Sequence, residues 1–319
     1  MMRVLKGDPI MTSAALPQLS RPFLTDAGLE TDILFNRGID LPHFASIVLL
    51  RTEQGRAALD QYFRGFLELA KRIGSGIVLE SATWRASSDW AAPLDLSQTE
   101  LTDLNREAVR MLVLLREEYR SAIPHIIVSG CIGPRGDGYD PGKIMSADDA
   151  EAYHAGQAGV LAAAGADMLS GITMTNVPEA IGLARAAEAL ETPVAISFTV
   201  ETDGRLPTGD RLAEAIPAVD AATSGYPDYY MINCAHPTHF AASLDPAAEW
   251  TARVRGVRAN ASRCSHAELD AMTELDCGDI AELAALYREL RAQFPAINVL
   301  GGCCGTDLRH VTAIAEACF

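Results

Sequence analysis

The chain has 319 residues, of which 49% are hydrophobic, so it can build the core of one large α/β domain or of two small ones. Its 26 basic and 42 acidic residues give a formal net charge of −16, which disfavours binding to nucleic acid or to an anionic membrane surface. No apolar run approaches the roughly 18 residues that a membrane-spanning helix needs. The expected partners are therefore small molecules or proteins.

Cysteine usage indicates the compartment. Seven cysteines, an odd number, do not fit a disulfide framework, and the first residues lack the pattern of a secretory signal, so we expect a reducing environment, the cytoplasm. Four of these cysteines are interpreted as small buried apolar residues: Cys131, Cys264, Cys277 and Cys318. Residues 1–20 show no clear periodicity and are predicted to form a loose tail before a domain spanning 21–319.

Short apolar or β-branched runs alternate along this domain with longer segments of helical period. The runs cover 23–28, 76–81, 125–130, 167–174, 193–200, 229–234, 254–261 and 297–302, and the clearest helical segments cover 53–73, 97–119, 146–165 and 279–294. Ser97 and Ser146 are predicted to be N-caps and Gly165 a C-cap.

Eight such repeats without a domain-sized linker predict a single (β/α)8 TIM barrel. A doubly wound sheet shows the same alternation and is the alternative. The seventh run is the weakest strand candidate because it contains Arg255 and Arg258.

The carboxyl ends of barrel strands share one mouth, which brings together cysteines that are distant in sequence. Cys234 ends the sixth run, and Cys303 with Cys304 follows the eighth in "LGGCCGT". Adjacent side chains on a regular strand point to opposite faces, so both sulfurs can serve one centre only if the backbone bends. Three glycines are expected to provide that freedom: Gly301, Gly302 and Gly305.

We predict that Cys234, Cys303 and Cys304 bind one Zn²⁺ ion. Zinc accepts thiolate ligands in a tetrahedron, and three protein ligands leave the fourth position for a substrate. A thiol bound there would lose its proton and, beside three anionic sulfurs, would remain electron-rich enough to attack an alkyl group. A strained vicinal disulfide between Cys303 and Cys304 is the redox alternative, but it leaves Cys234 unexplained.

The segment "INCAHP" followed far downstream by "GGCCGT" resembles the zinc-dependent homocysteine S-methyltransferase family. That family includes the betaine and S-methylmethionine enzymes and the homocysteine domain of cobalamin-dependent methionine synthase. The segments "LTDAGLET", "GCIGPRGDGY" and "ISFTVETDGRLPTG" agree with it, and the resemblance covers about residues 22–316. It implies a (β/α)8 barrel with zinc on the same three cysteines.

The resemblance also implies substrate residues. Asp26 matches the family's acidic residue that holds the homocysteine amino group, whereas Ile172 stands where the fourth strand of the family carries a second carboxylate. Glu30 and Glu80 are the candidates to replace that carboxylate, and Glu80 is favoured because it ends a predicted strand. A different thiol acceptor is the alternative.

Further substrate contacts are predicted at the mouth. Arg85 stands where the betaine branch carries an aromatic residue and would repel betaine, whereas the neighbouring Trp84 offers a ring face to a sulfonium methyl group. Thr173 and Asn233 either contact the substrate or satisfy neighbouring polar groups.

Two histidines close to Cys234 are possible zinc ligands. His236 and His239 follow directly after the predicted sixth strand, so helix capping or loop packing is the preferred interpretation. The three thiolates already complete a site with three protein ligands.

The predicted function is methyl transfer from a sulfonium donor, S-methylmethionine or S-adenosylmethionine, or from an ammonium donor, to homocysteine, giving methionine. A corrinoid donor would have to come from a partner protein. The alternatives are methyl transfer to another thiol and a zinc-binding or redox-sensing barrel without methyl transfer. A monomer or small homo-oligomer is expected.

Overall fold

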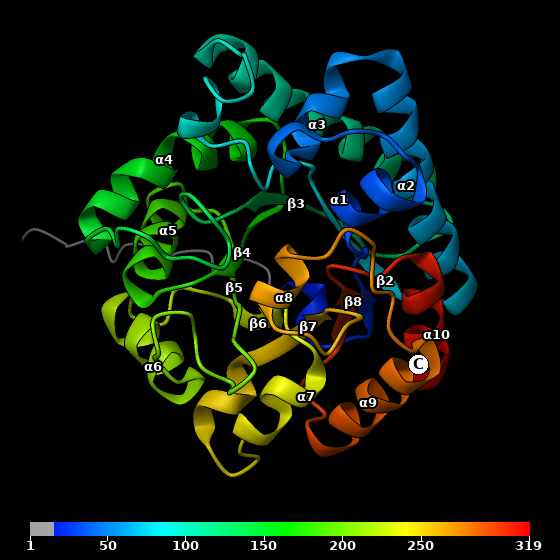
Figure 1. Cartoon of the computed structure of the whole chain (residues 1–319), viewed down its shortest axis with the longest axis vertical. Coiled ribbons are helices and arrows are strands. Elements are labelled where there is room, and N and C mark those ends of the chain that lie inside the picture. The colour runs from blue at the N-terminus through cyan, green and yellow to red at the C-terminus, as the bar shows by residue number, and fades with distance from the viewer. Residues whose placement is uncertain (1–15) are drawn as a thin grey trace, which may run out of the picture.

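Eight parallel strands close into a barrel in the computed structural model, which describes residues 16–319. Each strand pairs with the next in chain order, and β8 returns to pair with β1 (Figure 1). The strands are β1 Phe23–Leu24, β2 Gly76–Glu80, β3 Ile126–Ile132, β4 Met168–Met174, β5 Val194–Phe198, β6 Tyr229–Asn233, β7 Val254–Ala259 and β8 Val299–Gly302. The predicted TIM barrel is confirmed, and the doubly wound alternative is wrong.

Helices surround the barrel, except for α8 in the middle of their ring, and their ends follow the local sequence. They are α1 Leu29–Thr31, α2 Glu53–Ile73, α3 Gln98–Tyr119, α4 Ala147–Ala163, α5 Val177–Ala189, α6 Leu212–Ala222, α7 Pro237–Phe240, α8 His266–Asp270, α9 Ile280–Gln293 and α10 Leu308–Cys318. The side chains of Ser97 and Ser146 accept the predicted capping hydrogen bonds, and Gly165 takes the left-handed conformation just beyond α4. None of the described helices combines the length and apolar character needed to cross a membrane.

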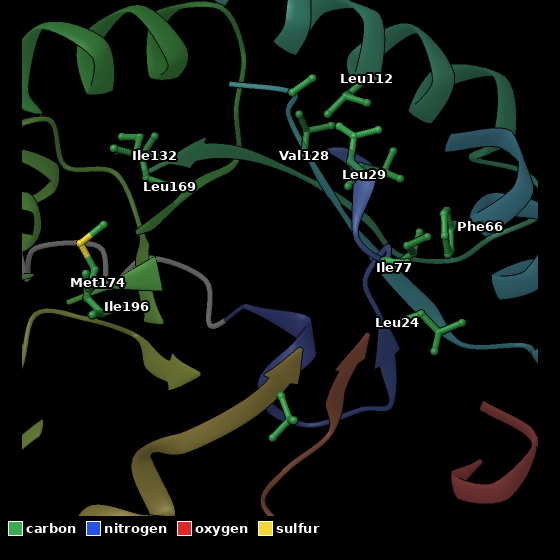
Figure 2. Packing of buried hydrophobic residues seen from close by; sticks show 14 of the residues in the cluster. Leu24, Leu29, Phe66, Ile77, Leu112, Val128, Ile132, Leu169, Met174 and Ile196 are labelled. Atoms are coloured by element: carbon green, nitrogen blue, oxygen red, sulfur yellow. The ribbon is translucent and has the colours of Figure 1, made fainter. Parts of the chain in front are cut away.

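Strand side chains alternate between two cores. Leu24 and Ile77 point outward to the helices, in the same cluster as Phe66 of α2 (Figure 2). Their neighbours Phe23 and Val78 belong to a second cluster, which also contains residues from β3, β4, β5, β6 and β8. This alternation is the pleat of the strand, and it leaves the polar residues at the strand ends to form the mouth.

The segment before β1 differs from the predicted loose tail. Residues 1–15 lie outside the described part, but Leu16 belongs to the second cluster and Gln18 is fully buried. Asn298 Nδ2 donates a hydrogen bond to the Gln18 carbonyl at 2.8 Å, and Gln18 Nε2 contacts the Met168 sulfur at 3.2 Å. These residues cover the amino-terminal end of the barrel, so residues 16–20 belong to the packed domain.

The weak seventh run is a true strand because both of its arginines find partners. Arg255 donates to the Leu19 carbonyl below the barrel. Arg258, at the opposite end of β7, is 6% exposed and makes an ion pair with Asp26. A buried cation is tolerated in a strand when a charged partner compensates it.

Candidate active site

A cavity of about 410 Å³ opens at the carboxyl ends of the strands. A concave site at this end of a TIM barrel is where the loops and strand ends of the fold bring reactive groups together. Of the predicted site residues, these line the cavity: Asp26, Glu30, Glu80, Trp84, Thr173, Cys234, Cys303 and Cys304. Asn233 does not line it and lies just beneath, fully buried.

The three predicted ligands converge on one point. Cys234 Sγ lies 3.1 Å from Cys303 Sγ and 3.6 Å from Cys304 Sγ, and all three sulfurs lie within 4.8 Å of one another. Cys234 has a φ of 56°, a left-handed conformation that is costly for a non-glycine residue and tends to be kept at functional sites. The predicted gathering of these three sulfurs in one cluster is confirmed.

Glycines in "LGGCCGT" allow this convergence in two different ways. Only Gly305 has a positive φ, 79°, so only there is left-handed freedom needed. At Gly301 a Cβ atom would lie 1.9 Å from Thr25 Oγ1, and at Gly302 it would lie 2.0 Å from Thr306 Oγ1. The expectation that all three glycines supply flexibility is therefore wrong for these two, which permit close approach of the backbone.

The donor set fits zinc. Four-coordinate zinc with Zn–S bonds of about 2.3 Å places its sulfur ligands about 3.8 Å apart, close to the separations seen here. Hydrogen bonds from the thiols of Cys234 and Cys304, helped by Arg258, hold the pKa of Cys303 well below its ordinary value. The lowered pKa favours the thiolate form of Cys303, whereas hydrogen bonding to Cys303 raises the pKa of Cys234.

Tyr139 and His266 also contact this cluster, and the sequence analysis missed both. The Tyr139 hydroxyl lies 3.3 Å from Cys234 Sγ and 3.6 Å from Cys304 Sγ. Its ring stacks on that of His266 with centroids 3.9 Å apart, and His266 Nε2 lies 2.6 Å from the Cys234 carbonyl oxygen. His266 begins α8, which lies in the middle of the ring of helices in Figure 1. The only sequence signal for Tyr139 was its place at the end of the segment "GCIGPRGDGY", which agrees with the family.

Asp26 already has two internal partners. Its Oδ2 accepts a hydrogen bond from the Tyr62 hydroxyl at 3.2 Å, and its Oδ1 lies 2.7 Å from Arg258 Nη2. Burial raises the pKa of Asp26, and Arg258 opposes that rise. Burial would by itself lower the pKa of Arg258, but the negative charges of Asp26 and Glu80 outweigh it and keep the guanidinium charged.

The two remaining carboxylates, those of Glu30 and Glu80, differ in their hydrogen bonding. Glu30 Oε1 accepts a hydrogen bond from Ser46 Oγ at 2.7 Å. Glu80 is 4% exposed, and neither of its oxygens has a donor within hydrogen-bond distance among residues 16–319, although the nearby hydroxyls of Ser129 and Ser170 help to lower its pKa. Its nearest cation is Arg258, with Nη1 at 4.0 Å from Oε1. Burial raises the pKa of both glutamates, and Arg258 opposes the rise at Glu80.

Asn233 organises the site from below. Its Oδ1 accepts hydrogen bonds from the Thr173 backbone N–H at 2.9 Å and from Ser197 Oγ at 2.6 Å. Its Nδ2 donates to Thr173 Oγ1 at 2.8 Å and faces Cys303 Sγ at 3.8 Å. The side chain therefore links β4, β5 and β6 to the cysteine pair.

Trp84 forms part of the cavity wall. Its Nε1 donates to the Ile172 carbonyl at 3.0 Å, which fixes the ring over the mouth. Arg85 lies with its guanidinium 5.0 Å from the Trp84 ring and 4.8 Å from the Trp90 ring, and it pairs with Asp137 at 3.0 Å. Part of the positive charge expected at this position is thus compensated.

The two histidines after β6 have structural contacts. His236 is the N-cap of α7, where its side chain accepts a hydrogen bond from the Thr238 backbone N–H. His239 Nε2 lies 2.9 Å from the Arg263 carbonyl oxygen. Capping and loop packing, the preferred interpretation, are confirmed.

Comparison with known families explains this combination of barrel and thiol cluster. The family model described as homocysteine S-methyltransferase matches residues 23–318. The chain belongs to the homocysteine S-methyltransferase family. It is accordingly an enzyme of the methyltransferase class. The family expected from the two cysteine motifs is thereby confirmed.

Individual relatives of this family member are distant. Homocysteine S-methyltransferase 4 from Zea mays is 25% identical over 262 residues, which cover 75% of each chain. The metallated form of the homocysteine methyltransferase MmuM from Escherichia coli superposes with a TM-score of 0.72 at 23% identity, over 93% of this chain and 96% of that one. The apo form of MmuM gives a TM-score of 0.66 at 22% identity, over 95% and 98%. At these identities the structural matches confirm the fold alone.

Proposed function

We propose that this family member transfers a methyl group from a cationic donor to the thiol of homocysteine, giving methionine, with Zn²⁺ held by Cys234, Cys303 and Cys304. The observation that carries the proposal is the convergence of these three sulfurs at the wall of a cavity in a homocysteine S-methyltransferase barrel. A cavity of about 410 Å³ is large enough for an amino-acid thiol beside a small donor.

Zinc at the three sulfurs supplies Lewis acidity that keeps a coordinating thiol deprotonated at neutral pH. The residues of the chain bind and align the reactants. Asp26 and Glu80 face the cavity as carboxylates for the ammonium group of the acceptor, Glu30 and Thr173 add polar contacts, and Asn233 steadies Cys303. The acceptor thiol first releases its proton to solvent. Its sulfur then bonds to the methyl carbon while the bond from that carbon to the donor heteroatom breaks, leaving the electron pair on the donor.

The walls of the cavity favour a cationic methyl donor. Trp84 presents an aromatic surface to a cationic methyl group, and the ion pair of Arg85 with Asp137 limits the repulsion of that cation by the guanidinium. Acidic residues on the outer part of the cavity add attraction for a cation: Asp137, Asp270, Glu274 and Asp276. S-methylmethionine and S-adenosylmethionine are both compatible with this chemistry.

The proposal places the enzyme in the cytoplasm, because its ligand thiols have to stay reduced. All seven cysteines are free thiols in the structure. The reaction requires only the small-molecule thiol and the methyl donor, so a monomer or a small homo-oligomer suffices.

The experiment is methionine formation by zinc-loaded protein from homocysteine with each candidate donor, together with zinc content per chain. Cys303→Ser is expected to lose stoichiometric zinc and activity. Cys131→Ser is the matched control, because Cys131 also lines the cavity but lies outside the sulfur cluster. Chelation should abolish methyl transfer and zinc should restore it. Absence of product with every donor, despite one bound zinc per chain, would contradict the proposal.

A further inference from the structure

Arg258 has a buried guanidinium group, and one of its nitrogens, Nη1, has no hydrogen-bond acceptor among residues 16–319. Its Nε donates to the Gly302 carbonyl and its Nη2 to the Ala27 carbonyl, both at 3.2 Å. Nη2 also forms the ion pair with Asp26, but Nη1 makes no hydrogen bond to residues 16–319. Because Arg258 lines the cavity, its Nη1 is available to donate a hydrogen bond to an acceptor group on a ligand.

The Glu80 carboxylate, by contrast, lacks hydrogen-bond donors. Both of its carboxylate oxygens are buried without a donor within hydrogen-bond reach among residues 16–319, whereas Asp26 Oδ1 has its ion pair with Arg258. Glu80 lines the same cavity as the metal-binding thiols. Buried polar atoms in a native protein normally have partners, so an unsatisfied carboxylate on a residue of the cavity wall indicates a ligand with N–H donors. A primary ammonium group offers three N–H donors.

The free Nη1 end of Arg258 and the Glu80 carboxylate lie side by side and carry opposite charges. Nη1 of Arg258 is 4.0 Å from Oε1 of Glu80, beyond hydrogen-bond reach but close enough for strong attraction. An α-amino acid carries an ammonium and a carboxylate on one carbon, so it can lie along this pair with each charge facing its opposite. A ligand with only one of the two charges would satisfy one side and leave the other unpaired.

We infer that Glu80 and Arg258 together recognise the acceptor as an α-amino acid, with Glu80 binding its ammonium and Arg258 Nη1 binding its carboxylate. This inference rests on the proposed function, since it concerns the acceptor of the same reaction. It accounts for the absence of a carboxylate at Ile172. Glu80 of β2 binds the ammonium group of the ligand, and Arg258 of β7 binds its carboxylate. Arg258 thereby becomes a specificity-determining residue.

The test uses three thiols that differ only in their charged groups. Homocysteine carries both charges, 3-aminopropane-1-thiol lacks the carboxylate, and 4-mercaptobutanoate lacks the ammonium. Binding of each thiol to the cobalt-substituted protein is followed by its absorption spectrum, and kcat and KM for methyl transfer are measured with the zinc protein. Variants are Arg258→Gln, Glu80→Gln and, as an exposed acid of α9 outside the cavity lining, Glu289→Gln.

The wild type should bind homocysteine at least about tenfold more tightly than either analogue. Arg258→Gln should weaken the binding of homocysteine by roughly 10- to 100-fold. It should leave the affinity for 3-aminopropane-1-thiol within about threefold of the wild-type value. Glu80→Gln should weaken the binding of both thiols that carry an ammonium group and leave the affinity for 4-mercaptobutanoate unchanged. Glu289→Gln should leave the affinities for all three thiols unchanged.

Uniform weakening of all three thiols in both variants would assign Glu80 and Arg258 a structural role and overturn the inference. So would a wild type that binds the three thiols equally. A wild type that binds no thiol at its metal and transfers no methyl group would instead overturn the proposed function. If Arg258→Gln fails to bind cobalt, the nearly isosteric Glu80→Gln decides the question through the ratio of its affinities for the three thiols.

Discussion

Replacing Gly301 by alanine tests whether close backbone contact, rather than flexibility, is what places the cysteine pair. Gly301 lies on β8 two residues before Cys303, beside β1. A Cβ atom there would meet Thr25 Oγ1 at 1.9 Å and the Asp26 carbonyl oxygen at 2.6 Å. Ordinary non-bonded contacts between heavy atoms lie near about 3.5 Å.

The magnitude follows from which of these atoms can move. Thr25 can change its rotamer, but the Asp26 carbonyl belongs to the backbone and accepts a hydrogen bond from Gly302 N at 2.9 Å. The β8 backbone therefore has to shift by about 0.5–1 Å to restore normal contact. Overpacking of this kind costs about 1–3 kcal/mol of the free energy of unfolding. The same shift displaces Cys303 from the other two sulfurs.

Urea unfolding and zinc content measure both effects. We expect Gly301→Ala to lose about 2 kcal/mol of unfolding free energy and at least about tenfold in zinc affinity. Gly156→Ala is the control, since Gly156 is exposed in α4 with nothing within 4 Å of its added Cβ, and it should gain about 0.5–1 kcal/mol. A Gly301→Ala protein with the wild-type unfolding midpoint and full zinc content would refute the reasoning.

Two further substitutions test the structure around the site. Asn233→Ala removes the acceptor of the Thr173 N–H and of Ser197 Oγ, so it should cost on the order of 2–4 kcal/mol in urea unfolding, and a loss below about 1 kcal/mol would contradict its organising role. Burial raises the pKa of Asp307, but hydrogen bonds from His310 and Arg309 outweigh it and hold that pKa below its ordinary value. Asp307 thus stabilises the fold above pH 4 and loses this effect as the pH falls. Asp307→Asn should be less stable than wild type by about 1 kcal/mol at pH 7, with the difference shrinking toward pH 2 in acid-dependent unfolding curves, and a constant difference would contradict it.

Much of the fold was predictable because its signals are local. Helix α2 begins and ends at the predicted residues, since its apolar periodicity and its flanking Thr52 and Gly74 are all in the sequence. The first strand was predicted over 23–28 but extends only over Phe23–Leu24, because the chain turns toward the mouth directly after it. Boundaries of this kind depend on pairing with neighbouring strands, which a single segment does not encode.

The cysteine motifs and the alternation of strand and helix determined by themselves the barrel, the family and the three thiols at one rim. Only the tertiary structure showed that Tyr139 contacts those thiols and that Glu80 lacks a partner while Arg258 keeps a free donor. These relations join residues of different strands and loops that lie about 95 to 180 positions apart in the printed sequence. Local patterns fix the type and order of elements, whereas closure of the barrel decides which distant side chains meet and which charges remain unsatisfied.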